Sequence, residues 1–127
     1  MLPELVEHTV PTLGICVPIK VLSVYNGDTV VCETRFRFRL RLIDAWAPEV
    51  TGPQKAKGLK AKAAMQKLCE GKIGTVLIPW QDDIGKMTSM GRILGSLNIN
   101  GDDIAYEMRK TGWAKLTKDE AADAWPE

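Results

Sequence analysis

Five residues combine side-chain types that act together on phosphate esters: two aspartates, two arginines and a glutamate. Asp28 and Asp44 each come after a segment typical of a β-strand, and Glu49 stands soon after the second aspartate. Arg39 lies in an alternating segment and Arg92 begins an apolar one. Carboxylates are hard oxygen ligands for divalent cations, and guanidinium groups pair bidentately with phosphate oxygens. These types indicate phosphodiester chemistry, which needs charge neutralisation and a group that positions or deprotonates water.

Each of these residues also has an ordinary structural interpretation. An aspartate after Asn26-Gly27 stabilises turns through its own backbone contacts. Residues 35–42 alternate strictly between arginine and apolar side chains, and a strand places the two kinds on opposite faces. Such a charged face is usually solvated, which is the role that we expect for Arg35, Arg37 and Arg41. The occurrence of all five candidates together favours a catalytic site.

The elements that must position these side chains follow from periodicity and turn residues. Five segments have the composition or alternation of strands, namely residues 15–25, 29–34, 35–42, 73–80 and 92–99. Asn26-Gly27 predicts a type I′ hairpin between the first two, and Asn100-Gly101 predicts another turn. The polar stretch 82–89 is a predicted loop.

Helices are predicted in three places. Residues 55–70 carry four core side chains at helical spacing, which are Ala61, Ala64, Met65 and Leu68, and Gly71 is a plausible stop. A short helix is predicted from Asp102 or Asp103 to Thr111, with Gly112 at its C′ position. Residues 117–120 have the spacing of a capping box before a last short helix.

This order of elements predicts a mainly β protein with helices, of the α+β class. Five strands with one helix after the third match a five-stranded OB-type Greek-key barrel, followed by two short C-terminal helices. We expect an N-terminal extension over residues 1–14 and a single domain over residues 15–127. Cys16, Cys32 and Cys69 form no C-x-x-C pair, so we expect free, buried thiols.

The composition limits the classes of protein to which the chain can belong. The chain has 127 residues, of which 45% are hydrophobic and 26% charged, which excludes the disordered class. Its net charge is only +1, yet residues 35–72 hold ten basic residues against three acidic ones and the two flanking segments are acidic. A focused positive region can attract polyanions despite a small total charge.

Several motifs together resemble the staphylococcal (thermonuclease-like) nuclease family. They are Asn26-Gly27-Asp28-Thr29, Arg39-Leu40-Arg41-Leu42-Ile43-Asp44, Pro48-Glu49, Gly91-Arg92, Asn100-Gly101 and Thr111-Gly112-Trp113-Ala114-Lys115. The resemblance spans residues 15–116. It implies an OB-type fold and Ca²⁺-dependent hydrolysis of DNA and RNA with low sequence specificity, leaving 3′-phosphate ends.

The resemblance also implies a role for each site residue. Asp28, Asp44 and the carbonyl of Ala45 would hold Ca²⁺, and Arg39 and Arg92 would stabilise the phosphoryl transition state. Glu49 would position or activate the attacking water, and the choice between these two roles stays open.

Two departures from the family pattern concern substrate binding. Ala45-Trp46-Ala47 places two more residues than usual before Pro48-Glu49, and Met90 stands where the family has an aromatic residue that packs on the nucleotide. Trp46 is a candidate replacement for that aromatic ring, although a core or lid position is the alternative. Lys86, in the polar loop, is a further candidate for substrate binding.

Three hypotheses remain at this stage. The first is the nuclease, the second is a catalytically weak or inactive OB-fold module that binds nucleic acid, and the third is a protein-interaction barrel. We expect a monomer whose partner is DNA or RNA and not a membrane. With no signal peptide visible in the sequence, we expect a cytoplasmic or phage- or plasmid-encoded intracellular protein, with secretion left open.

Overall fold

The computed structural model describes residues 14–118 together with 125 and 126. Within these residues the strands are β1 (Gly14–Asn26), β2 (Thr29–Glu33), β3 (Arg37–Leu42), β4 (Ile73–Pro79), β5 (Thr88–Ser89), β6 (Arg92–Ile99) and β7 (Asp102–Asp103). The helices are α2 (Lys55–Cys69) and α3 (Ile104–Thr111), with short 3₁₀ turns η1 (Gly52–Gln54) and η2 (Ile84–Met87).

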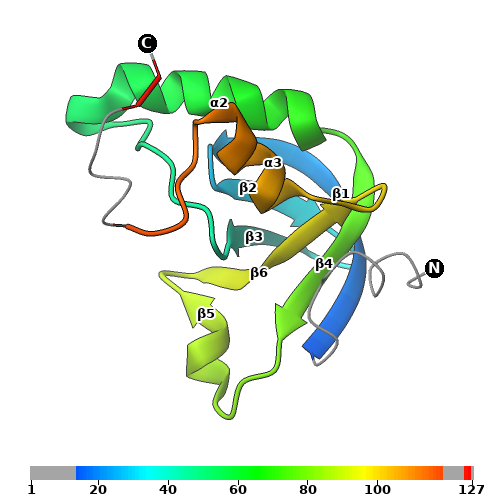
Figure 1. Ribbon diagram of the computed structural model, residues 1–127. Helices are drawn as coiled ribbons and strands as arrows, with labels where there is room; N and C mark the ends of the chain where they lie inside the picture. The colour runs from blue at the N-terminus through cyan, green and yellow to red at the C-terminus, as the bar shows by residue number, and fades with distance from the viewer. Residues whose placement is uncertain (1–13, 119–124, 127) are drawn as a thin grey trace.

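The five longer strands form a ring (Figure 1). β1 pairs antiparallel with β2 and β4, β2 pairs with β3, and β4 pairs with β6. A parallel pairing of β3 with β6, in which Leu40 lies opposite Ile93, closes the ring. This closure brings Arg39 and Arg92, which are far apart in the sequence, onto neighbouring strands.

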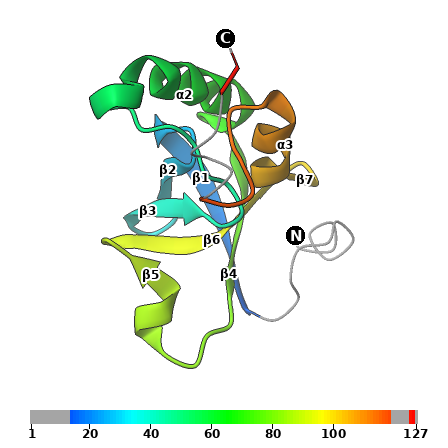
Figure 2. The same cartoon turned by 60° about the vertical axis from the view of Figure 1, so that its left-hand side comes forward.

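The two helices and the short strand β5 lie at opposite ends of this ring. Figures 1 and 2 show α2 and α3 side by side at one end, with η2 and β5 at the other. α2 begins after the Pro53-containing turn η1 and ends before Gly71, whose φ of 79° suits glycine. The segment between β3 and η1 runs from the ring toward α2.

The core fills the ring beneath α2. Leu40 and Leu42 of β3 and Met65 of α2 are fully buried in one cluster. Ala61 of the predicted helix face is also buried, and Ala64 and Leu68 are half-buried. Cys32 and Cys69 are buried free thiols, and burial raises the pKa of each to about 12. Cys16 is half-buried and also free.

The mainly β, α+β class is confirmed, whereas the count of five strands is wrong. β5 and β7 have two residues each, too short for a periodic signal. The predicted hairpin joins β1 to β2, but neither Asn26 nor Gly27 has the positive φ of a type I′ turn. Instead, the pairing of β1 with β2 shifts register between Val21 and Ser23 and between Val24 and Asn26. By contrast, Asn100 and Gly101 both have positive φ.

Of the two predicted C-terminal helices, the first lies within the described residues and the second lies largely outside them. α3 ends at Thr111, and Gly112 at its C-cap has a φ of 85°, as predicted. The last predicted helix falls largely on residues 119–124, outside the described residues. Neither helix in the described part is long and apolar enough to cross a membrane.

Candidate functional site

Two adjoining cavities open where β1 and β3 end and β6 begins. The larger has a volume of about 530 Å³ and the smaller about 240 Å³. They share Glu49, Met90 and Arg92. The larger is also lined by Asp28, Arg41, Asp44 and Trp46, and the smaller by Tyr25, Asn26, Thr29 and Arg39. The structure thus brings together all five candidates of the catalytic set.

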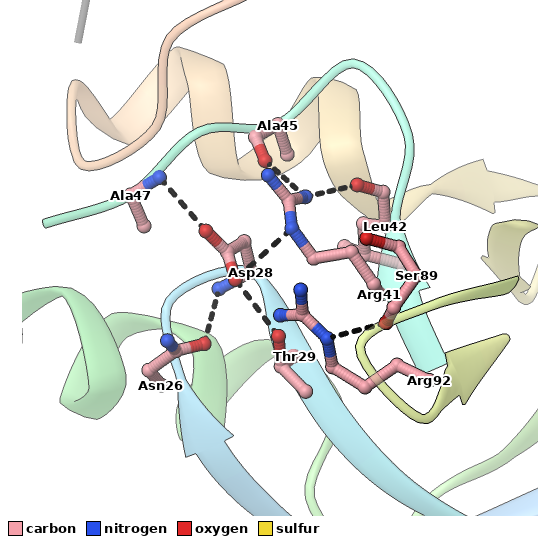
Figure 3. A network of polar contacts seen from close by, with 9 residues as sticks. All are labelled: Asn26, Asp28, Thr29, Arg41, Leu42, Ala45, Ala47, Ser89 and Arg92. Carbon is pink, nitrogen blue, oxygen red and sulfur yellow. Dashed lines mark hydrogen bonds and ion pairs between the residues drawn. The ribbon is translucent and has the colours of Figure 1, made fainter. Parts of the chain in front are cut away.

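Asp28 lies at the centre of a buried polar network (Figure 3). Its Oδ1 accepts a hydrogen bond from Thr29 Oγ1 at 2.8 Å and lies 3.7 Å from Arg41 Nε. Its Oδ2 accepts from the Ala47 N–H at 3.1 Å, while its own N–H donates to Asn26 Oδ1. The carboxylate therefore joins the β1–β2 turn to the segment that follows β3.

Arg41 is buried, so the prediction that it belongs to a solvated strand face is wrong. Only 8% of the residue is exposed, whereas Arg35 and Arg37 are exposed as expected. Its Nη1 donates to the carbonyls of Leu42 and, at 2.7 Å, Ala45. Burial lowers the pKa of Arg41; the charges of Asp28 and Glu49 oppose this and that of Arg92 adds to it. A guanidinium nevertheless stays protonated in proteins.

The long segment before Glu49 is tied down along its length. Asp44 adopts a φ of 59°, and its carbonyl accepts from Arg109 Nη1 at 2.6 Å. Trp46 and Lys115 exchange two backbone hydrogen bonds of 2.8 Å. These ties accommodate the two additional residues and turn the chain back toward the cavities.

Two glycines then permit the segment to pack closely against its neighbours. A Cβ on Gly27 would lie 2.7 Å from the Cβ of Ala47, and one on Gly58 would lie 1.9 Å from the Glu49 carbonyl oxygen. Because real Cβ contacts are longer than 3.0 Å, only glycine fits at either position. Gly58 of α2 therefore fixes the distance between the helix and Glu49.

Arg39, Arg92 and Glu49 line the smaller cavity together. Arg39 is exposed, and its guanidinium carbon lies 5.3 Å from the centroid of the Tyr25 ring. Arg92 is half-buried, and its Nε donates to the Ser89 carbonyl at 3.2 Å. Glu49 is exposed at the same opening. Two cations and one carboxylate therefore face a space large enough for a phosphate group.

The three predicted substrate-binding residues have different surroundings. Met90 is 90% exposed at the tip of the β5–β6 hairpin and borders both cavities. Trp46 lines the larger cavity, and its ring lies 4.5 Å from the guanidinium carbon of Arg41. Lys86 lies on η2, pairs with Asp82 at 2.7 Å and borders neither cavity.

The groups predicted to hold Ca²⁺ do not fit that ion as they are arranged. Both oxygens of Asp28 and the carbonyl of Ala45 already accept hydrogen bonds from protein donors. Ca²⁺ takes six to eight oxygen ligands. Within residues 14–118, 125 and 126, no three acidic, histidine or cysteine side chains gather closely enough to hold a metal. The Arg41 guanidinium contacts the Ala45 carbonyl and the Asp28 carboxylate, two of the groups that would coordinate the cation.

Sequence reasoning missed two contributors to this site. Tyr25 lies on β1 directly before Asn26-Gly27, and this position is the signal that the sequence offers for it. Arg41 was assigned to solvent because strand alternation groups it with Arg39. The segment that follows β3 covers this end of the face, with the Ala45 carbonyl and the Trp46 ring against the guanidinium, and such a contact has no periodic signal in the sequence.

The model of the family described as staphylococcal nuclease homologue matches residues 37–124, which is more than half of the chain. No curated protein sequence matches the chain significantly. The matched region contains β3, α2 and β6, and with them four of the five candidate residues.

Proposed function

The chain belongs to the staphylococcal nuclease homologue family, and on this premise we propose that it hydrolyses phosphodiester bonds in nucleic acids. The observation that carries the proposal is the convergence of Arg39, Arg92 and Glu49 on one cavity of about 240 Å³. A single cavity provides two guanidinium groups for a phosphate and one carboxylate for water. Contacts of this kind address the phosphate and not the base, which agrees with low sequence specificity.

Each of these three residues has its own role in the proposed hydrolysis. Arg39 and Arg92 bind the non-bridging phosphate oxygens and stabilise the charge that grows on them in the transition state. Glu49 positions a water molecule or accepts its proton as the water oxygen bonds to phosphorus. The bond from phosphorus to the leaving oxygen then breaks, and solvent protonates that oxygen. The 3′-phosphate product expected from the family corresponds to departure of the 5′ oxygen.

One observation favours the second candidate, a module that binds nucleic acid without cutting it. The family is typically calcium-dependent, and here Arg41 engages the Ala45 carbonyl and pairs with Asp28. A site without its divalent ion loses a source of transition-state stabilisation. Binding through Arg39, Arg92 and the aromatic ring of Tyr25 needs no metal.

One assay distinguishes the candidates. Purified full-length protein is incubated with end-labelled single-stranded DNA or RNA, in Ca²⁺ or in EDTA, and both cleavage and binding are measured. Cleavage by the wild type that falls about 10²–10³-fold in Arg39→Ala and in Arg92→Ala supports the nuclease. Binding without cleavage in either condition supports the module. Absence of both overturns the proposed function.

Arg37→Ala is the matched control for Arg39→Ala. Arg37 lies on the same strand and is exposed, and it pairs with Glu33 and lines neither of the two site cavities. Exposed pairs of this kind add little to stability. We expect Arg37→Ala to retain the wild-type rate, so equal losses in the two variants would indicate a general charge effect and count against the assignment of Arg39.

A further inference from the structure

Arg41 contacts the groups that the family would use to bind its metal. Its Nη1 donates to the Ala45 carbonyl at 2.7 Å, and its Nε lies 3.7 Å from Asp28 Oδ1. The ring of Trp46 covers the guanidinium at 4.5 Å. Figure 3 shows the Arg41 side chain between Asp28 and Ala45. A positive group of the protein therefore lies where two of the three predicted ligands meet.

Charge and geometry make this position difficult for a divalent ion to enter. Arg41 is 8% exposed and is held by two carbonyls as well as by Asp28. A bound Ca²⁺ would have to displace the guanidinium or tolerate a like charge beside it, with the ion pair to Asp28 lost in the first case. Breaking a buried ion pair by removing one partner is strongly destabilising. Such a cost would raise the Kd of any cation.

We propose that the Arg41 guanidinium takes the place of the divalent cation in this protein, so that the site meets phosphate with a fixed protein cation and does not take up Ca²⁺. The guanidinium neutralises Asp28 and adds positive charge beside Arg92. Part of this inference, the role toward phosphate, rests on the proposed function. The exclusion of Ca²⁺ does not, and it is tested without nucleic acid.

The first experiment titrates the wild-type chain with Ca²⁺ by calorimetry and with Tb³⁺ by luminescence excited through tryptophan, since Trp46 lies beside the site. We expect no saturable binding of Ca²⁺ at about 1 mM, the weak end of protein calcium sites. Saturable Ca²⁺ binding at or below this concentration, competing with Tb³⁺, would overturn the proposal.

The second experiment removes the charge of Arg41. We expect Arg41→Gln to gain saturable Tb³⁺ luminescence that Ca²⁺ competes away, and Asp28→Asn in the same chain to abolish the gain. Arg37→Gln, with the same charge change on the exposed part of β3, is the matched control and gains nothing. Arg41→Lys keeps a cation and also gains nothing.

Other outcomes of this series are equally decisive. An Arg41→Gln variant that unfolds cooperatively on heating but gains no cation binding would show that Asp28, Asp44 and Ala45 form no latent cation site, contrary to the proposal. Should both Arg41 variants fail to fold, the wild-type titration alone decides. A purely structural role for Arg41 predicts lost stability in the variants and no gained luminescence.

The nucleic-acid assay keeps this inference separate from the proposed function. A difference of less than about twofold between Ca²⁺ and EDTA, in cleavage or binding of single-stranded DNA, supports a fixed cation. A Ca²⁺ ion that contacted the phosphate in the transition state would change the cleavage rate far more, since the loss of one such contact costs about 10²–10³-fold. Cleavage that requires Ca²⁺ would support the nuclease and overturn the inference. Absence of both cleavage and binding would overturn the nuclease function. The titration with Ca²⁺ and Tb³⁺ would still decide whether the site excludes Ca²⁺.

Discussion

The close approach of Gly58 to Glu49 provides a test of how the long segment after β3 places its glutamate. We consider the substitution Gly58→Ala, which adds one methyl group to α2. The new Cβ would lie 1.9 Å from the Glu49 carbonyl oxygen and 2.8 Å from the Val50 nitrogen. Both neighbours are backbone atoms, so no rotamer change relieves the contact. The helix and the segment must separate.

The size of the effect follows from this distance. To reach the 3.0 Å that Cβ contacts respect, the Glu49 backbone must move by roughly 1 Å, and a misplacement of about 1 Å can cost about 10²-fold in rate. Overpacking costs about 1–3 kcal/mol, which the removal of a helix-interior glycine offsets by about 1 kcal/mol. We therefore expect kcat/KM for single-stranded DNA to fall about 10²-fold with only a small change in Tm.

Two further variants identify the cause. Gly85→Ala is the matched control, because its Cβ would meet no atom closer than 3.4 Å, and it should retain full activity. Gly58→Ala combined with Glu49→Ala should be no slower than Glu49→Ala alone, since both changes act through one side chain. A Gly58→Ala protein with wild-type activity, or losses that simply add, would refute the reasoning.

Two other predictions concern Met90 and the buried thiols. Met90 is 90% exposed beside both cavities, so Met90→Phe should lower the Kd for single-stranded DNA, measured by fluorescence anisotropy, because stacking contributes about 1–3 kcal/mol per base; an unchanged Kd would show that bases do not reach this hairpin. Burial raises the pKa of Cys32 and of Cys69 from 9.0 to about 12. The folded state therefore keeps both thiols protonated where the unfolded chain ionises, and the stability that they contribute is complete below pH 9 and lost as the pH rises toward 12. The free energy of unfolding, measured with urea, should decline more steeply above pH 9 than in Cys32→Ala/Cys69→Ala; equal slopes would contradict this.

Local patterns in the sequence predicted most of the longer elements. Apolar residues at helical spacing predicted α2 to within one residue of its end at Cys69. β-Branched and apolar composition predicted β1 and β4. The free cysteines followed from their spacing. Each of these features depends on neighbours within a few turns of chain, where a sequence is informative.

The features that escaped prediction depend on contacts between distant segments. The negative φ of Gly27 shows that this glycine serves close packing against Ala47 and Ala61 and not a left-handed turn. Arg41 is buried by the segment after β3, whose Ala45 carbonyl and Trp46 ring contact its guanidinium. For the candidate site, the residue types indicated a phosphate-binding cavity, whereas the hydrogen bonds that both oxygens of Asp28 accept could only come from the fold.

Two features of this chain, the two additional residues before Pro48-Glu49 and the buried Arg41, are connected by their contacts. Ala45 gives its carbonyl to Arg41, Trp46 lays its ring over the same guanidinium, and Ala47 donates its N–H to Asp28. Every residue of the lengthened stretch therefore contacts the Arg41–Asp28 pair. A shorter connection would lack groups to cover a buried guanidinium and to accept its hydrogen bond, and an apolar residue at position 41 would leave the Ala45 carbonyl without its donor. The longer segment is thus better explained as the cover of the Arg41 guanidinium than as additional chain that separates Glu49 from the site.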